Sequence, residues 1–482
     1  MKEAYLIIDI GTGNVRVAVA NVKGEVISVE RDNVHYKKDE LYANALSFNP
    51  DELWEQIIAL TKKVLHNHPD LDMTAITASS QREGVVLLGP EGESLIGLPN
   101  HDHRGREWEN AISDSDKTYV YQLAGRYPSS LFSAMKLIGL KNKHPELYER
   151  VTTMVSISDW AQYKLTGIKG YEPSQASETL LYDVEKKSWS KGLCTIFGIS
   201  ENILPDLRLS GTVLGKILPE YADSLNISPE VIVIVGGADT QLAIKSTQPS
   251  VDDIVIVSGT TTPVVKIINE YKVDQHQRTW TNRHIERDTF ILETNAGVTG
   301  LNYQRLKEVF YPNEGYEVIE KELSELSGKP QCVASLGSLI ADEKSPLTKG
   351  GFIFDAPVSD QLTRACFVWA ALWDIACCIK ENFDSLCDVT PYHQDYVWAC
   401  GGGLQSGILR QFIASLTNKK IQLREGYKQA SVSGGALICN ELLVKNEHVD
   451  TEITITFPKD LEYYNSLYKE WKKVRSGFKQ IF

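Results

Sequence analysis

The sequence lacks several features that mark other classes of protein. None of its apolar runs approaches the roughly 18 residues that a membrane-spanning helix needs, and the longest, such as VIVIV at 231–235, have the length of a strand. Its eight cysteines are scattered, without a C-x-x-C pair, so the spacing indicates neither a disulfide framework nor a zinc site. We therefore expect no membrane partner, and cysteines that pack as small apolar side chains.

Positive charge is also in short supply. The 482 residues include 50 Lys and Arg against 63 Asp and Glu, a formal net charge of −13. The net negative charge repels polyanions, and the chain has no basic stripe of the kind that nucleic-acid-binding proteins use. We therefore expect no nucleic-acid partner, and any phosphate ligand must be bound by local groups.

The length of the chain favours two domains, because a single hydrophobic core stops growing at roughly 250 to 300 residues. The polar segment KSTQPSVDD at 245–253 contains Pro249 and is typical of a domain boundary. We predict domains at 1–247 and 248–482. The opening MKEAYLIIDI has no cleavage site of small residues, which predicts a cytoplasmic protein.

Strand and helix patterns alternate along the chain, which predicts an α/β protein. The segment LIIDIGTGNVRVAV at 6–19 predicts two strands around a Gly-Thr-Gly turn, and DIVIVSGTTTPVV at 253–265 repeats that layout. NPDELWEQIIALTKKVLHNHP at 49–69 has apolar residues at helical spacing. The repeated hairpin indicates a duplicated architecture with a cleft between two halves, although two unrelated hairpins explain it equally well.

The first hairpin carries two charges that its turn does not need. Backbone N–H groups at a glycine-rich turn can bind phosphate oxygens, to which Thr12 would add a hydroxyl and Arg16 a positive charge. Asp9 would repel a bare phosphate but fits a site in which Mg²⁺ lies between them. An ordinary structural hairpin is the simpler alternative.

Two further glycine-rich segments follow strands. In VIVIVGGADTQLAIKS at 231–246, Asp239 opens a predicted helix at the end of a strand, where α/β folds bind ligands; a plain helix cap explains it equally well. In CGGGLQSGILRQF at 400–412, three glycines would let a ligand approach the start of a helix. Tight packing of helix on strand, without a ligand, is the alternative there.

A charged pair follows the predicted strand AITASS. Arg82 and Glu83 lie in SSQREGVVL at 79–87, and PNHDHRGRE at 99–107 lies across the next hairpin. An adjacent arginine and glutamate offer a polyol a fork of donors and an acceptor. A surface ion pair is the ordinary alternative.

Taken in order, these segments resemble the FGGY family of carbohydrate kinases. D-x-G-T at 9–12, Q-R-E at 81–83, G-G-x-D at 236–239, the Gly-Thr turn at 259–260 and G-G-G at 401–403 follow that family over essentially the whole chain. The resemblance implies an ATP- and Mg²⁺-dependent kinase. It also implies two RNase H-like domains of the actin/hexokinase-like ATPase fold, which close over a sugar or polyol in a central cleft.

The resemblance also assigns roles to single residues. It makes Asp239 the general base and places Asp239 and Asp9 at the magnesium. It assigns the binding of ATP to Thr12, Gly13, Asn14, Arg16, Gly259, Thr260, Gly300, Gln304, Gly402, Gly403 and Ser406. It assigns the substrate hydroxyls to Arg82, Glu83, Asn100, Asp102 and Asp239.

The chain departs from the family pattern where glycerol kinases carry aromatic rings. Gly139 replaces a tryptophan, Leu131 replaces the tyrosine of glycerol kinases, and Asn100 replaces the tryptophan of their W-Q-D segment. REGVVL, PNHDHR, ISDWAQYKLTG and VGGADTQL are most similar to autoinducer-2 kinases, with xylulokinase-like enzymes next. A glycerol kinase and a non-enzymatic nucleotide-binding regulator on the same fold stay as alternatives, and the resemblance is compatible with a homodimer.

Overall fold

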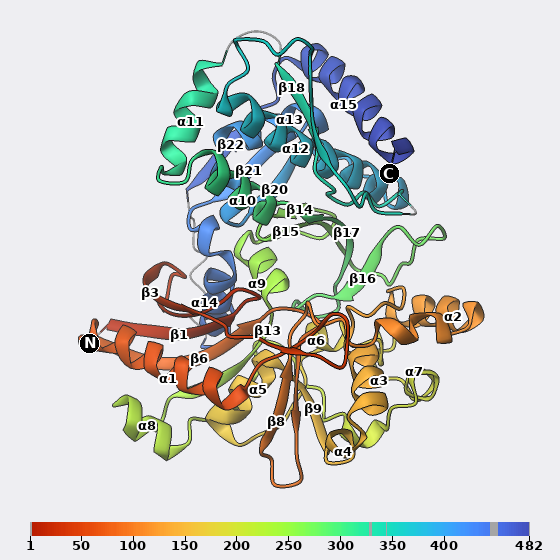
Figure 1. Ribbon diagram of the computed structural model, residues 1–482. Coiled ribbons are helices and arrows are strands. Elements are labelled where there is room, and N and C mark those ends of the chain that lie inside the picture. Colours follow the sequence, from red (N-terminus) through yellow and green to blue (C-terminus); the bar gives the residue numbers. More distant parts are fainter. Residues whose placement is uncertain (1, 327–329, 344, 444–451, 482) are drawn as a thin grey trace.

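The structure, a computed structural model, describes residues 2–326, 330–343, 345–443 and 452–481. It is built from two α/β halves, one above the other in Figure 1. We call residues 2–246 the first half and the described residues from 254 onward the second half. Each half contains one main sheet, of six strands in the first half and seven in the second.

The two main sheets share one topology. In the first sheet, β1 pairs antiparallel with β2 and parallel with β6, which is parallel to β13. In the second sheet, β14 pairs antiparallel with β15 and parallel with β20, which is parallel to β21. The first sheet has the order β12 (Val213–Lys216), β13 (Ile232–Ala238), β6 (Leu71–Ser80), β1 (Lys2–Ile10), β2 (Asn14–Asn21), β3 (Val26–Asn33). The second, given from its corresponding edge, has the order β22 (Ile453–Thr456), β21 (Lys420–Arg424), β20 (Tyr396–Cys400), β14 (Ile254–Val257), β15 (Thr261–Ile268), β17 (Phe290–Val298), β16 (Trp280–Arg283). The duplication predicted from the two Gly-Thr hairpins is confirmed.

Helices cover both sheets. The helix predicted at 49–69 is α1, which begins as its sequence predicts, because Asn49 accepts a hydrogen bond of 3.0 Å from the backbone of Asp51 and proline takes the first helical position. Outside the smaller lobe described below, the helices of eight or more residues are α1 (Pro50–His66), α5 (Ile157–Thr166), α9 (Asp239–Ser246), α10 (Gly300–Phe310), α11 (Tyr316–Glu325), α12 (Arg364–Val389), α13 (Gly407–Thr417), α14 (Ala430–Leu442) and α15 (Leu461–Ile481).

The first half also carries a smaller lobe beside its main sheet, at the lower right of Figure 1. A three-stranded sheet, β7 (Val85–Leu88), β8 (Ser94–Leu98) and β9 (Thr153–Ser156), lies next to the helices α2 (Asp114–Ala124), α3 (Ser133–Lys143), α4 (Pro145–Tyr148) and α7 (Lys191–Phe197). The Q-R-E loop lies between β6 and β7, so it joins the main sheet to this lobe. Short elements complete the fold: β4 (Lys37–Asp39), β5 (Ala45–Ser47), α6 (Pro173–Ala176), β10 (Tyr182–Asp183), β11 (Ser188–Trp189), α8 (Pro219–Leu225), β18 (Cys332–Ser335) and β19 (Gly351–Phe354).

The helices α9 and α14 lie between the two main sheets (Figure 1). On α9, Leu242 belongs to the apolar cluster that contains Ile7 of β1, whereas Ile244 belongs to the cluster that contains Val255 of β14. A Cβ atom on Gly434 of α14 would lie only 1.9 Å from the Leu242 carbonyl oxygen, so only glycine allows the two helices to cross this closely. Asp239, the first residue of α9, is thereby fixed at the junction of the halves.

The predicted boundary at 247 and 248 separates the strands of the two main sheets, since α9 ends at Ser246 and β14 begins at Ile254. The chain nevertheless crosses back, because α14 packs on β1 and β6 of the first half. The division into domains at this boundary stays a prediction.

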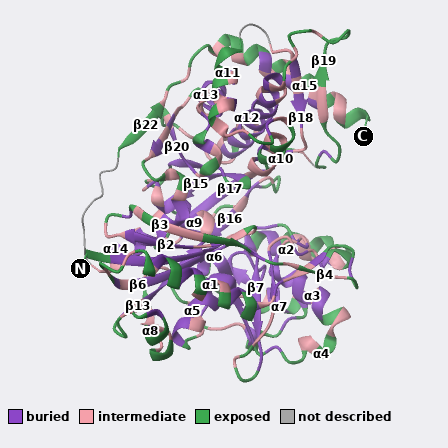
Figure 2. Cartoon of the chain, turned by 60° about the vertical axis from the view of Figure 1, so that its left-hand side comes forward, coloured by how far each residue is buried: buried purple, intermediate pink, exposed green. Residues whose placement is uncertain are grey.

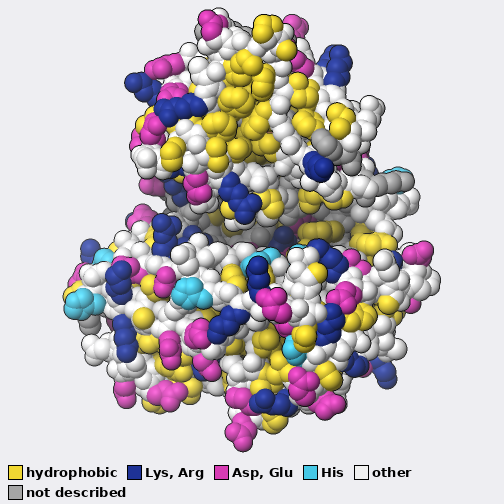
Figure 3. Space-filling model, viewed as in Figure 1, with side chains coloured by type: hydrophobic (Ala, Val, Ile, Leu, Met, Phe, Trp, Pro, Cys, Tyr) yellow, Lys and Arg dark blue, Asp and Glu magenta, His cyan; other side chains and the backbone are white. Residues whose placement is uncertain are grey.

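Burial follows the two sheets, whose strands form the purple interior of each half in Figure 2. The surface is hollowed between the halves in Figure 3. None of the helices in the described ranges is long and apolar enough to cross a membrane.

Candidate active site

The first glycine turn is tied to the second half of the chain through Asp9. This buried carboxylate accepts hydrogen bonds from Ser79 Oγ at 2.8 Å and Ser431 Oγ at 2.9 Å, and it forms an ion pair with Arg16. Arg16 also donates to Gln429 Oε1 at 2.9 Å. Because Gln429 and Ser431 lie at the start of α14, this helix connects the first turn to the second half.

The three glycine segments of the second half meet at one edge of its sheet. A Cβ atom on Gly300 would lie 2.1 Å from the Gly259 carbonyl oxygen, and one on Gly403 would lie 2.3 Å from Ser258 Oγ. The Gly403 N–H donates to the Ser258 carbonyl at 3.0 Å. The segments around 259, 300 and 402, which are far apart in the sequence, therefore lie next to one another.

These segments also reach the connection that binds Arg16. The Gly401 N–H donates to the Tyr427 carbonyl at 2.8 Å, and Tyr427 is two residues before Gln429, the partner of Arg16. The residues assigned to ATP in both halves are therefore linked through the short segment 427–431.

The glycine turns leave open space beside their backbone. A Cβ atom on Gly13 or Gly402 would meet no atom within 4 Å, and Gly259 and Thr260 are exposed. Thr12 Oγ1 accepts a hydrogen bond of 2.9 Å from the Asn100 side chain. Backbone groups at such open turns are accessible to a phosphate.

The other residues assigned to ATP have more ordinary surroundings. Asn14 is half-buried at the start of β2, and its carbonyl accepts from Gly11 N at 2.9 Å. Ser406 is buried and caps α13 by accepting from Leu409 N at 3.2 Å. Gln304 is exposed on α10. Their contacts with a nucleotide stay a prediction.

Asp239 is half-buried at the first position of α9. Of the residues that the structure describes, Thr240 alone hydrogen-bonds to its carboxylate, with the Thr240 N–H at 2.6 Å from Oδ1. Burial raises the pKa of Asp239 to about 7, with a further increase from the negative charge of Asp9. A carboxylate with one free oxygen and a pKa near neutrality is suited to accept a proton.

A magnesium site at Asp9 and Asp239 stays a prediction, because Asp9 is buried and both its oxygens already accept hydrogen bonds, from Ser79 and from Ser431. The charge of Asp9 raises the pKa of Asp239, so the carboxylates repel one another, and a divalent cation would remove this repulsion. In the described part of the chain, no group of three or more His, Cys, Asp or Glu could hold a metal ion. Mg²⁺ does not need such a group, because it commonly takes one or two carboxylates together with water and phosphate oxygens.

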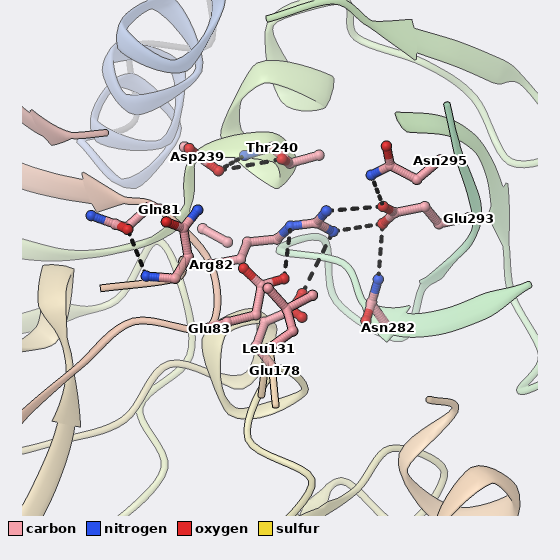
Figure 4. A network of polar contacts seen from close by, with 12 residues as sticks. Gln81, Arg82, Glu83, Leu131, Glu178, Asp239, Thr240, Asn282, Glu293 and Asn295 are labelled. Carbon is pink, nitrogen blue, oxygen red and sulfur yellow. Dashed lines mark hydrogen bonds and ion pairs between the residues drawn. The ribbon is translucent and has the colours of Figure 1, made fainter. Parts of the chain in front are cut away.

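The Q-R-E loop lies beside Asp239 (Figure 4). Gln81 Oε1 accepts the Asn100 N–H at 2.9 Å. Glu83 has a φ of +61°, a left-handed conformation that costs a residue with a side chain free energy and is common at functional sites. Arg82 donates both terminal nitrogens to Glu293 of β17, at 2.6 and 2.9 Å.

A second buried ion pair lies next to Arg82. Arg126 donates to Glu178 Oε1 at 2.6 Å, and this oxygen is 3.6 Å from Arg82 Nη1. The Asn282 and Asn295 amides donate to Glu293 at 3.2 and 3.1 Å. Our sequence reasoning missed Glu178 and Glu293, because neither belongs to a motif and both come from distant segments.

Buried side chains fix the segment around Asn100 through hydrogen bonds. Lys136 is buried and donates to the Asn100 carbonyl at 3.0 Å and to the Leu131 carbonyl. Asp102 is fully buried, and its two oxygens accept from Leu46 N at 2.9 Å and Arg104 Nε at 2.7 Å. Both Asp102 oxygens are thus engaged within the protein, and the role of Asp102 toward a substrate stays a prediction.

The departure at Gly139 has a steric reason. A Cβ atom there would lie 2.5 Å from the Arg104 carbonyl oxygen, so the local packing leaves no space for a tryptophan at this position.

Comparisons with known proteins identify the family of this chain. Residues 4–245 match the model of the N-terminal domain of the FGGY family of carbohydrate kinases. The chain is 50% identical to the putative sugar kinase YoaC of Bacillus subtilis, with 99% of this chain and 98% of that protein covered. It is 23% identical to an autoinducer-2 kinase of Salmonella paratyphi A, with 89% and 84% covered.

Solved structures show the same fold. A xylulose kinase from Lactobacillus acidophilus matches with a TM-score of 0.85 at 17% identity, covering 98% of each chain. A gluconate kinase from the same organism matches with a TM-score of 0.85, covering 99% of this chain and 98% of that one. The two halves thus have the actin/hexokinase-like ATPase fold, and the chain belongs to the FGGY family of carbohydrate kinases.

Proposed function

We propose that this carbohydrate kinase transfers the γ-phosphoryl group of Mg²⁺-ATP to a primary hydroxyl of a small linear sugar or polyol, as an autoinducer-2 kinase-like or xylulokinase-like enzyme. The position of Asp239 carries the proposal. Its unpartnered oxygen lies at the junction of the two halves, and the Q-R-E loop lies beside it.

In the proposed reaction, Asp239 accepts the proton of the substrate hydroxyl while the hydroxyl oxygen attacks the γ-phosphorus in line. The new P–O bond forms as the bond to the β-phosphate oxygen breaks, and ADP leaves. Most of the catalysis then comes from positioning, which can supply about 7 to 11 kcal/mol, and the base adds about 10² to 10⁴-fold.

The glycine turns and Arg16 have the properties that phosphate binding requires. Gly13, Gly259, Thr260 and Gly402 border open or exposed space. Arg16 is fixed by Asp9 and Gln429. Magnesium, held by Asp9 and Asp239 partly through water, would supply neutralisation of the phosphate charge.

The substrate proposal is supported by the relatives and by the residues that replace aromatic rings. The relative from Salmonella paratyphi A is named an autoinducer-2 kinase, and one solved neighbour is a xylulose kinase. Leu131 and Asn100 take the positions of rings in glycerol kinases, which disfavours the glycerol alternative. A regulator without catalysis would not need a base such as Asp239. A homodimer and a cytoplasmic location stay predictions from the sequence.

The test is an ATP-consumption assay coupled to ADP formation, run over ketoses, polyols, sugar acids and the linear autoinducer-2 precursor. We expect sugar-dependent ADP formation with one neutral linear sugar well above the rest, and product that carries one phosphate. ATP binding without turnover on any of these compounds would favour the non-enzymatic alternative.

A further inference from the structure

The charges beside Asp239 include two guanidinium groups that are both paired with carboxylates of the protein. Glu293 binds Arg82 through two nitrogens, at 2.6 and 2.9 Å. Glu178 binds Arg126 at 2.6 Å. All four side chains are buried or nearly so. Arg82 is thus already paired through two nitrogens by the chain itself. Arg126 is held less completely, because its Nε and Nη1 have no hydrogen-bond partner in the described part of the chain and burial raises the pKa of Glu178 to about 8.

The pairing of Arg82 has the form that recognition of a carboxylate ligand takes. Two parallel N–H···O bonds from one guanidinium bind a carboxylate strongly and with a defined geometry. Glu293 provides that carboxylate from within the chain, and the Asn282 and Asn295 amides hold it in place. A carboxylate on the substrate would have to compete with Glu293 for Arg82.

The remaining charges also disfavour an anion. Glu83 lies 3.9 Å from Arg82 Nε, and Asp239 faces the same loop. Arg126 lies over the rings of Phe132 and Trp280, at 5.2 and 4.7 Å from their centroids, which further restricts its access to a ligand. A sugar acid placed beside Asp239 would meet the Glu83 carboxylate and an Arg82 that Glu293 already binds, and like charges placed together cost affinity.

Lys136 is another buried cation near this site. Its ammonium group donates to the carbonyls of Asn100 and Leu131, and burial lowers its pKa to about 8. Both contacts fix the loops on either side of it, so Lys136 is occupied with positioning the backbone.

We infer that the sugar site selects uncharged polyhydroxyl substrates over sugar acids, and that Glu293, by pairing with Arg82 from the second half of the chain, is the residue that determines this selectivity. The inference rests on the proposed kinase function and extends it, because the relatives include solved structures named for a neutral sugar and for a sugar acid.

The test compares the best neutral sugar from the substrate screen with D-gluconate. We expect the unmodified chain to prefer the neutral sugar by at least about 100-fold in kcat/KM, since like-charge contacts cost several kcal/mol. Glu293→Gln removes the charge and keeps the shape, and we expect it to reduce this ratio at least about tenfold. Gluconate binding is also measured by calorimetry, which needs no turnover, and we expect tighter binding to Glu293→Gln than to the unmodified chain.

Two variants separate charge from structure. Glu293→Asp keeps the charge and should retain most of the selectivity. Glu286→Gln removes one charge of the second half from an ion pair with Lys245 and should leave the ratio unchanged.

A gluconate preference in the unmodified chain would overturn the inference and leave the kinase assignment intact. An unchanged ratio in Glu293→Gln, or an equal loss in Glu293→Asp, would overturn the role of Glu293. Absence of sugar-dependent ATP consumption would instead contradict the proposed function, and calorimetry of the unmodified chain with gluconate and D-xylulose would still test the selectivity.

Discussion

Gly300 and Gly259 are in such close contact that a methyl group on Gly300 would lie 2.1 Å from the Gly259 carbonyl oxygen. The atom in the way belongs to the backbone, so no side chain can rotate to make space. The turn at 259–260 and the start of α10 are thus positioned against each other, and both are assigned to ATP.

We therefore predict that Gly300→Ala impairs the use of ATP. The alanine must displace the turn at 259–260, and a misplacement of about 1 Å can cost about 10²-fold in rate. We expect KM for ATP to rise at least about tenfold while KM for the sugar changes little. Gly477→Ala is the control, because its Cβ would meet no atom within 4 Å. Equal ATP kinetics in Gly300→Ala and the control would contradict the assignment.

Asp239→Asn tests the general base. The amide keeps the size of the side chain but cannot take a proton, so turnover should fall by about 10² to 10⁴-fold. Nucleotide binding, measured by calorimetry, should stay within a few-fold of the unmodified chain. A turnover number near that of the unmodified chain would refute the role of Asp239.

The pKa of Asp239 also predicts a pH profile. Burial and the charge of Asp9 raise this pKa to about 7, and only the deprotonated carboxylate accepts a proton. The kcat/KM for the sugar should therefore fall as pH decreases, with its midpoint at about 7 or lower because a Mg²⁺ ion would remove the contribution of Asp9, and level off above that midpoint. A flat profile between pH 5.5 and 7 would contradict a base with this pKa.

The parts of the fold and site that depend on residues close together in the sequence could be predicted from it. The two hairpins, α1 and the start of α9 at Asp239 follow from local spacing, turn residues and capping. Arg82 and Glu293 are 211 residues apart, and only the assembly of the two sheets brings them together. Ser431 was missed for the same reason, because it contacts Asp9 only when α14 packs on the sheet of the first half.

Whether a polar side chain is engaged inside the protein or free to bind a ligand could not be predicted from the sequence either. Asp102 has the residue type expected for a hydroxyl-binding group, yet its oxygens are taken by Leu46 N and Arg104. Whether a polar side chain faces a ligand or the interior depends on packing from segments far along the chain.

A buried carboxyl near Asp239 predicts how stability depends on pH. Glu172 accepts from Ser174 N at 2.8 Å, and Ser174 Oγ accepts from Ala238 N at 3.0 Å. Burial raises the pKa of Glu172 from 4.5 to about 8. The folded state therefore keeps a proton that the unfolded state releases, so the contribution of Glu172 to stability is greatest below about pH 4.5 and is lost as pH rises toward 8.

The loss from this one group amounts to at most about 1.4 kcal/mol per pH unit. Glu172→Gln cannot ionise and keeps an acceptor, so we expect its Tm to fall less between pH 6 and pH 8 than that of the unmodified chain. Glu230→Gln, which removes an exposed ion pair with Lys216, should behave like the unmodified chain. The same fall in Tm for Glu172→Gln would contradict a buried, protonated Glu172.

The final prediction concerns glycerol. Where glycerol kinases use rings, this chain has Leu131 and Asn100, and the groups around Asp239 are donors and acceptors of hydrogen bonds. A linear substrate of about five carbons offers more hydroxyls than glycerol to the buried atoms here that lack a partner in the described part of the chain, which include Glu178 Oε2 and Arg126 Nη1. Each unpaired buried group costs about 1 to 3 kcal/mol. We therefore expect kcat/KM for glycerol to be at least about two orders of magnitude below that for the best five-carbon sugar. Comparable values for glycerol and that sugar, measured under the same conditions, would contradict the substrate proposal and leave membership of the kinase family intact.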